Sequence, residues 1–146
     1  MGLTEDIGQG PVALDTAAFI YLIEEHQRFL PIVEPLFEGI DAGHIQAVTS
    51  TLTLLETLVV PYRAGNVRLA ECYEDVLSHS RGLELVEMDR HVLRAAAALR
   101  AKTAMKTPDA IQMATALTAR CTAFVTNDRR LPRVPGIRSL SLSDYG

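Results

Sequence analysis

Residues 107–128 read TPDAIQMATALTARCTAFVTND. The first half favours a helix, because a threonine N-cap, a proline at the first helical position and Asp109 in the first turn follow one another. A short connection leads to residues 123–126, an apolar run typical of a buried strand, and Asp128 lies just beyond it. The stretch therefore predicts a helix followed by a strand, with an acid near each end of the unit.

The rest of the chain repeats this alternation of strands and helices. Apolar runs predict strands at 12–15, 45–48, 83–86, 123–126 and 137–140. Helical spacing and capping residues predict helices at 16–29, 31–43, 51–62, 66–80 and 89–103, in addition to the one from 107. Short strands need cover on both faces, so we expect a three-layer α/β domain with a central, mainly parallel sheet of about five strands. Residues 1–10 are expected to be a loose lead-in, and 11–146 a single domain.

Composition excludes several classes of protein. Apolar residues make up 48% and charged residues 22%, as in ordinary globular proteins. Aromatic residues reach only 5%, so a surface that stacks single-stranded bases on aromatic rings is not expected. The net charge of −4 disfavours broad contact with phosphates, but arginines cluster after Asp128 and basic residues precede Asp109. Either these clusters contact phosphates or they are solvated faces.

Cellular location is indicated by the cysteines and by the apolar runs. Cys72 and Cys121 show neither CxxC spacing nor a second pair, which is typical of a reduced, cytoplasmic protein. No run approaches the roughly 20 apolar residues that span a bilayer, and the N-terminus lacks the features of a signal peptide. We expect a cytoplasmic protein with no membrane partner.

Four carboxylates stand where free negative charge is usually avoided: Asp15, Glu56, Asp109 and Asp128. Asp15 and Asp128 follow predicted strands, and ligands of open α/β sheets bind at the carboxyl ends of strands. Glu56 shares its helical face with Leu52, Thr53, Val59 and Val60, where an unpaired carboxylate would cost several kcal/mol. A hard divalent cation such as Mg²⁺ or Mn²⁺ would remove that cost and could hold a phosphodiester.

Each acid also has an ordinary structural explanation. Asp109 suits a helix start, Asp128 suits a turn and Asp15 suits an N-cap. Glu56 could instead pair with an arginine such as Arg63. Taken singly, none of the four establishes a site.

Other catalytic chemistries find little support. The four histidines are scattered and lie near no Ser or Cys nucleophile motif. Neither GxxxxGK[ST] nor GxGxxG occurs, so the sequence lacks the usual phosphate-binding loops. A phosphoaspartate hydrolase would need a second acid two positions after Asp15, and that residue is Ala17. A small-molecule phosphatase therefore has only the α/β fold and Asp15 in its favour.

Four segments in this order resemble the PIN domain, in particular VapC-type toxins of toxin-antitoxin pairs. They are LDT at 14–16, Glu56 in a helix after the second strand, TPDAIQMA at 107–114 and FVTND at 124–128. The resemblance extends over the whole ordered chain. It implies a PIN-like fold whose acidic pocket is lined by Asp15, Glu56, Asp109 and Asp128.

The same resemblance implies an endoribonuclease that needs one or two Mg²⁺ or Mn²⁺ ions. Activated water would cleave the RNA phosphodiester and leave 5′-phosphate and 3′-hydroxyl ends. Asp15 and Asp109 would be the most direct ligands, and Glu56 and Asp128 would act partly through water or complete a second metal position. The supporting polar residues would be Thr16, Thr126 and Asn127.

Partners follow from the resemblance as well: an RNA substrate, a VapB-like antitoxin that blocks the acids, and a second copy in a homodimer. The helices at 16–30 and 50–62 offer apolar side chains for such surfaces, although core packing is the commoner explanation for them. Many relatives carry a further acid shortly after the position of Asp128, whereas this chain has arginines there. We expect Arg129, Arg130 and Arg133 to contact RNA phosphates. The alternative is a PIN-like domain that binds RNA or protein without cleavage.

Overall fold

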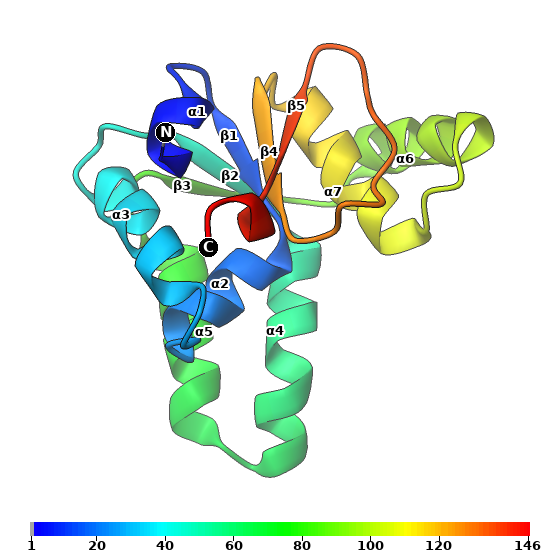
Figure 1. Cartoon of the computed structure of the whole chain (residues 1–146). Coiled ribbons are helices and arrows are strands. Elements are labelled where there is room, and N and C mark those ends of the chain that lie inside the picture. Colours follow the sequence, from blue (N-terminus) through cyan, green and yellow to red (C-terminus); the bar gives the residue numbers. More distant parts are fainter. Residues whose placement is uncertain (1) are drawn as a thin grey trace.

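A five-stranded parallel sheet forms the centre of the protein in the computed structural model, which describes residues 2–146. The strands lie in the order β3-β2-β1-β4-β5, and all four neighbouring pairs are parallel (Figure 1). Their bounds are β1 Val12–Leu14, β2 Ala47–Ser50, β3 Leu83–Val86, β4 Ala123–Thr126 and β5 Arg138–Ser141. The predicted α/β class and mainly parallel sheet are confirmed.

Helices cover both faces of this sheet. They are α1 Leu3–Ile7, α2 Thr16–Ile23, α3 Leu30–Asp41, α4 Thr51–Ala64, α5 Val67–His79, α6 Arg90–Lys102 and α7 Thr107–Thr118, with a 3₁₀ turn η1 at Leu142–Asp144. Alternate strand residues enter two separate cores. Leu14 and Val125 pack in the core that includes α1, α2 and α3, whereas Ala13 and Phe124 pack against α6 and α7. The result is the expected three-layer arrangement.

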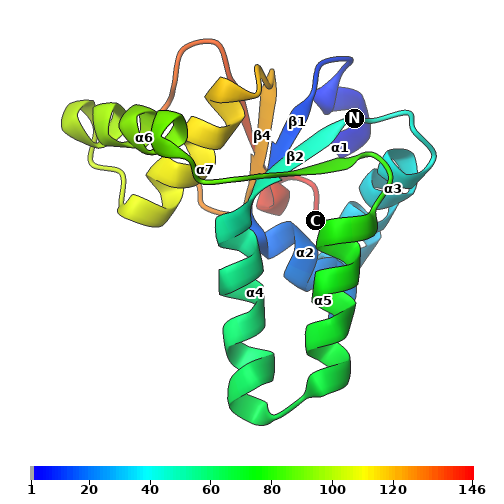
Figure 2. The same cartoon turned by 180° about the vertical axis from the view of Figure 1, so that it is seen from behind.

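Helices α4 and α5 form a hairpin that extends away from the sheet beyond its carboxyl edge (Figure 2). Gly65 ends α4 in the left-handed conformation at φ 66°, which a residue without a side chain adopts at little cost. Leu58, Ala70 and Tyr73 form a small core between the two helices and α2. Because nothing in the described chain covers the outer side of the hairpin, several of its apolar side chains are exposed.

The prediction of a loose lead-in at residues 1–10 is wrong for the part of it that forms α1; Met1 lies outside the described residues. Leu3 and Ile7 are four positions apart on one helical face and are buried in the first core. The Arg138 guanidinium donates hydrogen bonds to the carbonyl oxygens of Asp6 and Ile7, which satisfies groups that a short helix leaves free at its end. Arg138 lies on β5, 131 residues after Ile7, so local sequence patterns cannot indicate this contact.

Most other element bounds agree with expectation to within a few residues. The helix predicted at 16–29 ends at Ile23, and a turn containing Glu25 at φ 51° precedes α3. The second strand lies at 47–50 rather than 45–48, and Ser50 still caps α4 by accepting a hydrogen bond from the Leu52 N–H. Within residues 2–146, no helix combines the length and the hydropathy that crossing a membrane requires.

Candidate functional site

Asp15 and the turn that contains Asp128 meet at the carboxyl edge of the sheet. Strands β1 and β4 are neighbours in which Leu14 pairs with Val125, so both segments leave the sheet side by side. The Asp15 N–H donates to the Val125 carbonyl oxygen at 3.1 Å. The Asp15 side chain also caps α2 by accepting from the Ala17 N–H at 3.1 Å. The cap interpretation is therefore correct, and it coexists with the predicted place of Asp15 at the strand end.

Three of the four predicted acids line one cavity of about 190 Å³: Asp15, Glu56 and Asp109. They come from the starts of α2 and α7 and from the middle of α4. Thr16 and Gln112 complete the polar part of the lining. Carboxylates separated by many residues in sequence therefore converge at the edge where parallel sheets bind ligands.

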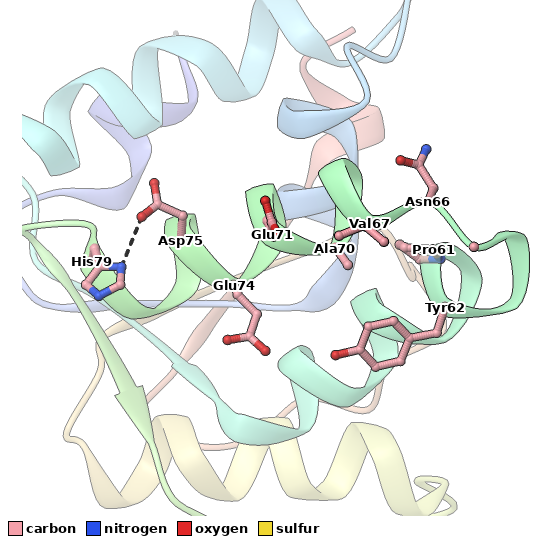
Figure 3. Close-up of a pocket in the computed structure, with 10 residues that line it drawn as sticks. Pro61, Tyr62, Asn66, Val67, Ala70, Glu71, Glu74, Asp75 and His79 are labelled. Carbon is pink, nitrogen blue, oxygen red and sulfur yellow. Dashed lines mark hydrogen bonds and ion pairs between the residues drawn. The ribbon is translucent and has the colours of Figure 1, made fainter.

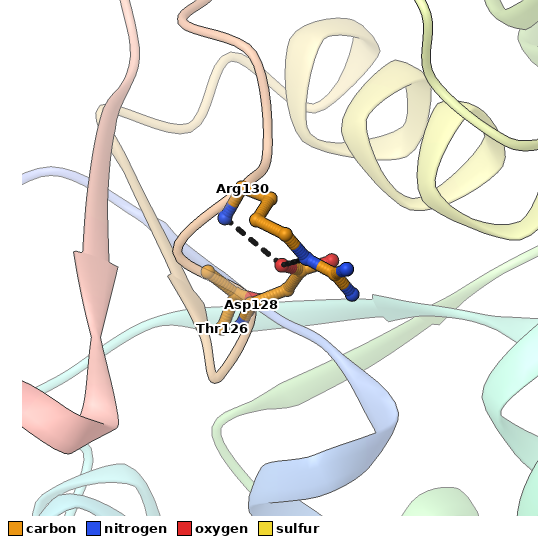
Figure 4. A network of polar contacts seen from close by, with 3 residues as sticks. All are labelled: Thr126, Asp128 and Arg130. Atoms are coloured by element: carbon orange, nitrogen blue, oxygen red, sulfur yellow. Dashed lines mark hydrogen bonds and ion pairs between the residues drawn. The ribbon is translucent and has the colours of Figure 1, made fainter.

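Asp128 lies beside this cavity rather than in its lining. Its Oδ1 accepts a hydrogen bond from the Arg130 N–H at 2.9 Å and lies 3.4 Å from Arg130 Nε (Figure 4). The hydrogen bond from the Arg130 N–H lowers the pKa of Asp128, whereas burial raises it. The Arg130 guanidinium lowers it again, so the pKa of Asp128 lies below its usual value. The expectation that all four acids line one pocket is thus met by three of them.

The charge on Asp128 still reaches the cavity through Asp109. Burial raises the pKa of Asp109, and the nearby Asp128 carboxylate raises it further. Lys106 and Arg130 act in the opposite direction because their positive charges favour the ionised acid. Asp109 and Asp128 are therefore electrostatic neighbours, with two cations close to the pair.

Asp15 is the acid most affected by burial. Desolvation raises its pKa from 3.8 to about 6. Hydrogen bonds from the Thr126 hydroxyl and from the backbone N–H groups of Ala17, Asn127 and Ala18 oppose this rise. A carboxylate that has lost much of its water gains more from a bound cation than a solvated one does.

The predicted environment of Glu56 is wrong, although its convergence with the other acids is found. The buried face of α4 consists of Thr53, Thr57, Leu58 and Pro61. Val59 and Val60 are 42% and 60% exposed, so the face that Glu56 shares with them is not an apolar interior. The half-buried carboxylate instead accepts a hydrogen bond from Thr16 Oγ1 at 2.6 Å, and Thr16 rather than Arg63 is its partner.

The three predicted supporting residues all bond within or next to the site. Thr16 holds Glu56, as described above. Thr126 Oγ1 accepts from the Asp128 N–H at 3.1 Å. Asn127 bonds through its side chain to Tyr21 and Ser143, two residues that the sequence did not single out.

Gln112 lines the cavity, but it was not among the site residues predicted from the sequence. Its side chain is buried, its Nε2 donates to Thr53 Oγ1 at 2.8 Å, and its Oε1 accepts from the Ser50 N–H at 3.4 Å. Thr53 in turn shares a 2.7 Å hydrogen bond with Thr49. The sequence did contain a signal for Gln112: it lies three residues after Asp109 on α7, and residues three apart share a helical face.

The donors in this site suit a hard divalent cation. Carboxylate and hydroxyl oxygens are the ligands that Mg²⁺ and Mn²⁺ prefer, and such ions retain several waters. As placed, no three His, Cys, Asp or Glu side chains among residues 2–146 are close enough together to hold a metal by themselves. The donor chemistry therefore fits, and water or substrate oxygens would have to supply part of the coordination.

The predicted RNA-contacting arginines differ in their surroundings. Arg129 Nη2 lies 2.5 Å from the Asp144 carboxylate, and Arg130 bonds Asp128. Arg133 is exposed and lines a separate cavity near β5. Arg130 is thus the arginine whose charge acts on two of the acids.

A larger cavity of about 590 Å³ lies along the α4–α5 hairpin (Figure 3). Tyr62 and Val67 contribute its apolar side, whereas Glu71, Glu74 and Asp75 contribute negative charge. None of the four predicted acids lines it. The smaller cavity remains the candidate active site, because that is where the carboxylates converge.

Comparison with known proteins gives a consistent result. The sequence matches the family model of the PIN domain over residues 12–137. A toxin-antitoxin complex from Klebsiella pneumoniae is similar in structure at 21% identity and a TM-score of 0.65, covering 86% of this chain and 94% of that chain. VapBC2 from Rickettsia felis bound to a DNA fragment from its promoter matches at 17% identity and a TM-score of 0.66, covering 90% and 98% of the two chains.

DNA-bound VapBC from Salmonella typhimurium matches at 23% identity and a TM-score of 0.63, again covering 90% and 98%. A search of curated proteins gave no match. At these identities the structural likeness concerns the fold, while the family match covers most of the chain. The chain therefore belongs to the PIN domain family, whose members are generally nucleases.

Proposed function

We propose that this protein is a cytoplasmic endoribonuclease that depends on Mg²⁺ or Mn²⁺ and serves as the toxin of a type II toxin-antitoxin pair. The observation that carries the proposal is the convergence of Asp15, Glu56 and Asp109 on one cavity at the carboxyl edge of the sheet, with Asp128 beside Asp109. A dense group of carboxylates in a partly dehydrated setting is unfavourable without a cation. Family membership supplies the nuclease class.

Each acid has a distinct part in the proposed reaction. Asp15 and Asp109 bind one or two divalent ions directly. A bound ion supplies Lewis-acid polarisation of the phosphodiester and lowers the pKa of water. Glu56, held by Thr16, orients the attacking water, and Asp128 supplies further negative charge next to Asp109. Water adds to phosphorus and gives up a proton, and the bond between phosphorus and the 3′ oxygen breaks. That oxygen takes up a proton and leaves as a hydroxyl, and the phosphate stays on the 5′ oxygen.

RNA would be held by arginine rather than by aromatic stacking. Arg130 is exposed next to Asp128, and Arg133 is exposed a few residues further on. Planar guanidinium groups bind phosphate through paired hydrogen bonds. Arg129 is less available because Asp144 already occupies it.

An antitoxin partner and a homodimer are part of the same proposal. The similar solved structures are toxin-antitoxin complexes, which supports a partner of that kind. Leu55, Val59 and Tyr62 recur along one face of α4 and are exposed, so the hairpin offers an apolar surface for a protein contact. The same helix contributes Glu56 to the cavity that Asp15 and Asp109 also line.

The test is to sequence RNA ends after induced expression of the wild type and of Asp15→Asn. We expect new 5′-phosphate ends with the wild type and their loss with the variant, because the amide cannot bind a cation as a carboxylate does. Asp41→Asn, on an exposed position at the end of α3, is the matched control. Purified protein should also cleave RNA with Mg²⁺ and stop when the ion is chelated. Full activity of Asp15→Asn, or cleavage that survives chelation, would contradict the proposal.

The second candidate is a PIN-like domain that binds RNA or protein without cleavage. It is favoured by one observation: the described side chains do not form a three-ligand metal group as placed. Calorimetry with Mn²⁺ separates the two functions. Binding to the free protein or to its RNA complex supports the nuclease, and no binding to either supports the second candidate.

A further inference from the structure

The Asn127 side chain is held at both ends by residues from other elements. Its Nδ2 donates a 2.8 Å hydrogen bond to the Tyr21 hydroxyl on α2. Its Oδ1 accepts a 2.7 Å hydrogen bond from Ser143 Oγ in η1, which follows β5. One side-chain amide therefore connects the turn after β4 to two separate parts of the fold.

The same turn carries contacts to two of the site acids. The Asn127 N–H and the Thr126 hydroxyl both lie near the Asp15 carboxylate and favour its ionised form. Asp128 is the next residue, and its N–H bonds Thr126 Oγ1 at 3.1 Å. Any rotation of the peptide at Asn127 would move the donors to Asp15 and the direction of Asp128 together.

Tyr21 and Ser143 are themselves fixed in place. The Tyr21 ring stacks on Phe29 with centroids 4.7 Å apart and an interplanar angle of 22°, and it also contacts His26 at 4.7 Å. Ser143 follows the fully buried Leu142, which anchors η1 in the core. The two partners of Asn127 therefore present their hydroxyl groups from packed positions, as preorganised supports do.

We propose that Tyr21 and Ser143 are positioning residues that orient Asp15 and Asp128 by holding the Asn127 side chain. The inference depends on the proposed function, since it concerns the acids of that site. Neither residue lines the cavity, so both act through Asn127 and not on substrate. Groups that orient metal ligands typically change metal affinity or activity by about 10- to 100-fold when removed.

A purely structural role would give a different result. If these hydrogen bonds served only to attach η1 to the sheet, their loss would lower stability and leave metal affinity and turnover unchanged. If they orient the acids, metal affinity and kcat fall, whereas the KM for RNA, which depends on the exposed Arg130 and Arg133, stays nearly constant. The two roles therefore differ in which measured quantity changes.

The experiment uses Tyr21→Phe and Ser143→Ala, each of which removes a hydroxyl and leaves the surrounding packing in place. Two variants are matched controls: Tyr73→Phe, which removes a hydroxyl that bonds Glu24 away from the acids, and Ser78→Ala, at an exposed position of the hairpin. Calorimetry measures the Mn²⁺ dissociation constant in the absence of RNA. RNA cleavage gives kcat and KM, and thermal unfolding of the metal-free proteins reports stability.

We expect each site variant to weaken Mn²⁺ binding and to lower kcat by about tenfold, with KM within about twofold of wild type. Ser143→Thr, which keeps the hydroxyl, should restore both values. Wild-type affinity and kcat in Tyr21→Phe and Ser143→Ala, or equal losses in the control variants, would overturn the inference while leaving the nuclease proposal intact. Failure of the wild type itself to bind Mn²⁺ and to cleave RNA would overturn the proposed function first.

Discussion

The hydroxyl of Thr16 donates a 2.6 Å hydrogen bond to Glu56 Oε1, which joins the first turn of α2 to the middle of α4. Forty residues separate the two in sequence. Because Thr16 directly follows Asp15, this bond brings the α4 carboxylate to the acid at the end of β1. The relationship explains why Glu56 faces the cavity even though its helix extends away from the sheet.

Replacing Thr16 by valine tests this relationship. Valine has nearly the same shape but no donor, so Glu56 loses its orienting bond. We expect RNA cleavage to fall by about tenfold, in line with the loss of a group that orients a ligand. Thr4→Val on α1 is the control, and both variants should unfold cooperatively. Unchanged cleavage by Thr16→Val would show that the bond does not orient Glu56 for the reaction.

Burial of Asp15 predicts a pH dependence of stability in the metal-free protein. Its pKa is about 6 when folded and 3.8 as the reference value, so the folded state favours the protonated acid. The favourable contribution is fully present below pH 3.8 and is lost as the pH rises through about 6. The free energy of unfolding of the wild type, relative to Asp15→Asn, should therefore fall by at most about 3 kcal/mol across this range.

Urea unfolding in the presence of a chelator, at several pH values between about 3.5 and 7, measures this difference. This range includes both the reference pKa and the folded-state pKa of Asp15. Subtracting the Asp15→Asn curve removes the titration of the other groups. Asp41→Asn, at an exposed position at the end of α3, should show no such change. A constant difference between wild type and Asp15→Asn would mean that Asp15 is better solvated than its position indicates.

Because the Gln112 amide is buried, we expect its replacement to lower stability more than the replacement of an exposed glutamine would. In Gln112→Leu, Thr53 loses a donor and the Ser50 N–H loses an acceptor inside the protein. Leaving such groups unsatisfied costs about 1–3 kcal/mol. Urea unfolding should show a decrease of that size for Gln112→Leu, while the exposed Gln46→Leu stays near wild type. Equal effects in the two variants would contradict the structural role of Gln112.

The elements that could be predicted from sequence are those specified by local patterns. The apolar run at 123–126 forms β4 where expected. Helix α7 begins at the Thr-Pro-Asp segment, although Lys106 rather than Thr107 is its N-cap and no side chain caps it. Asp15 was placed correctly because the end of a strand and the cap of the next helix coincide there. Parallel order then brings such ends to one edge without further information.

The parts that could not be predicted depend on distant partners. Gln112 bonds Thr53 across 59 residues, and α1 is completed by Arg138 near the other end of the chain. The environment of Glu56 was misjudged because α4 extends beyond the sheet, where no element covers Val60. Apolar spacing indicates which residues share a helical face, but only the tertiary arrangement decides whether that face is buried.

Arg129 and Arg130 are adjacent in sequence, but they pair with different carboxylates, and this predicts different effects on RNA binding. Arg130 is next to Asp128 and acts on Asp109, whereas Asp144 occupies Arg129. Arg130→Ala should raise the KM for RNA severalfold and reduce the salt dependence of binding by roughly 0.7 in log–log slope, the value for one phosphate contact on a single strand. Arg129→Ala should change both much less. Cleavage and binding assays over a salt series check this, and equal effects of the two substitutions would contradict a specific phosphate contact by Arg130.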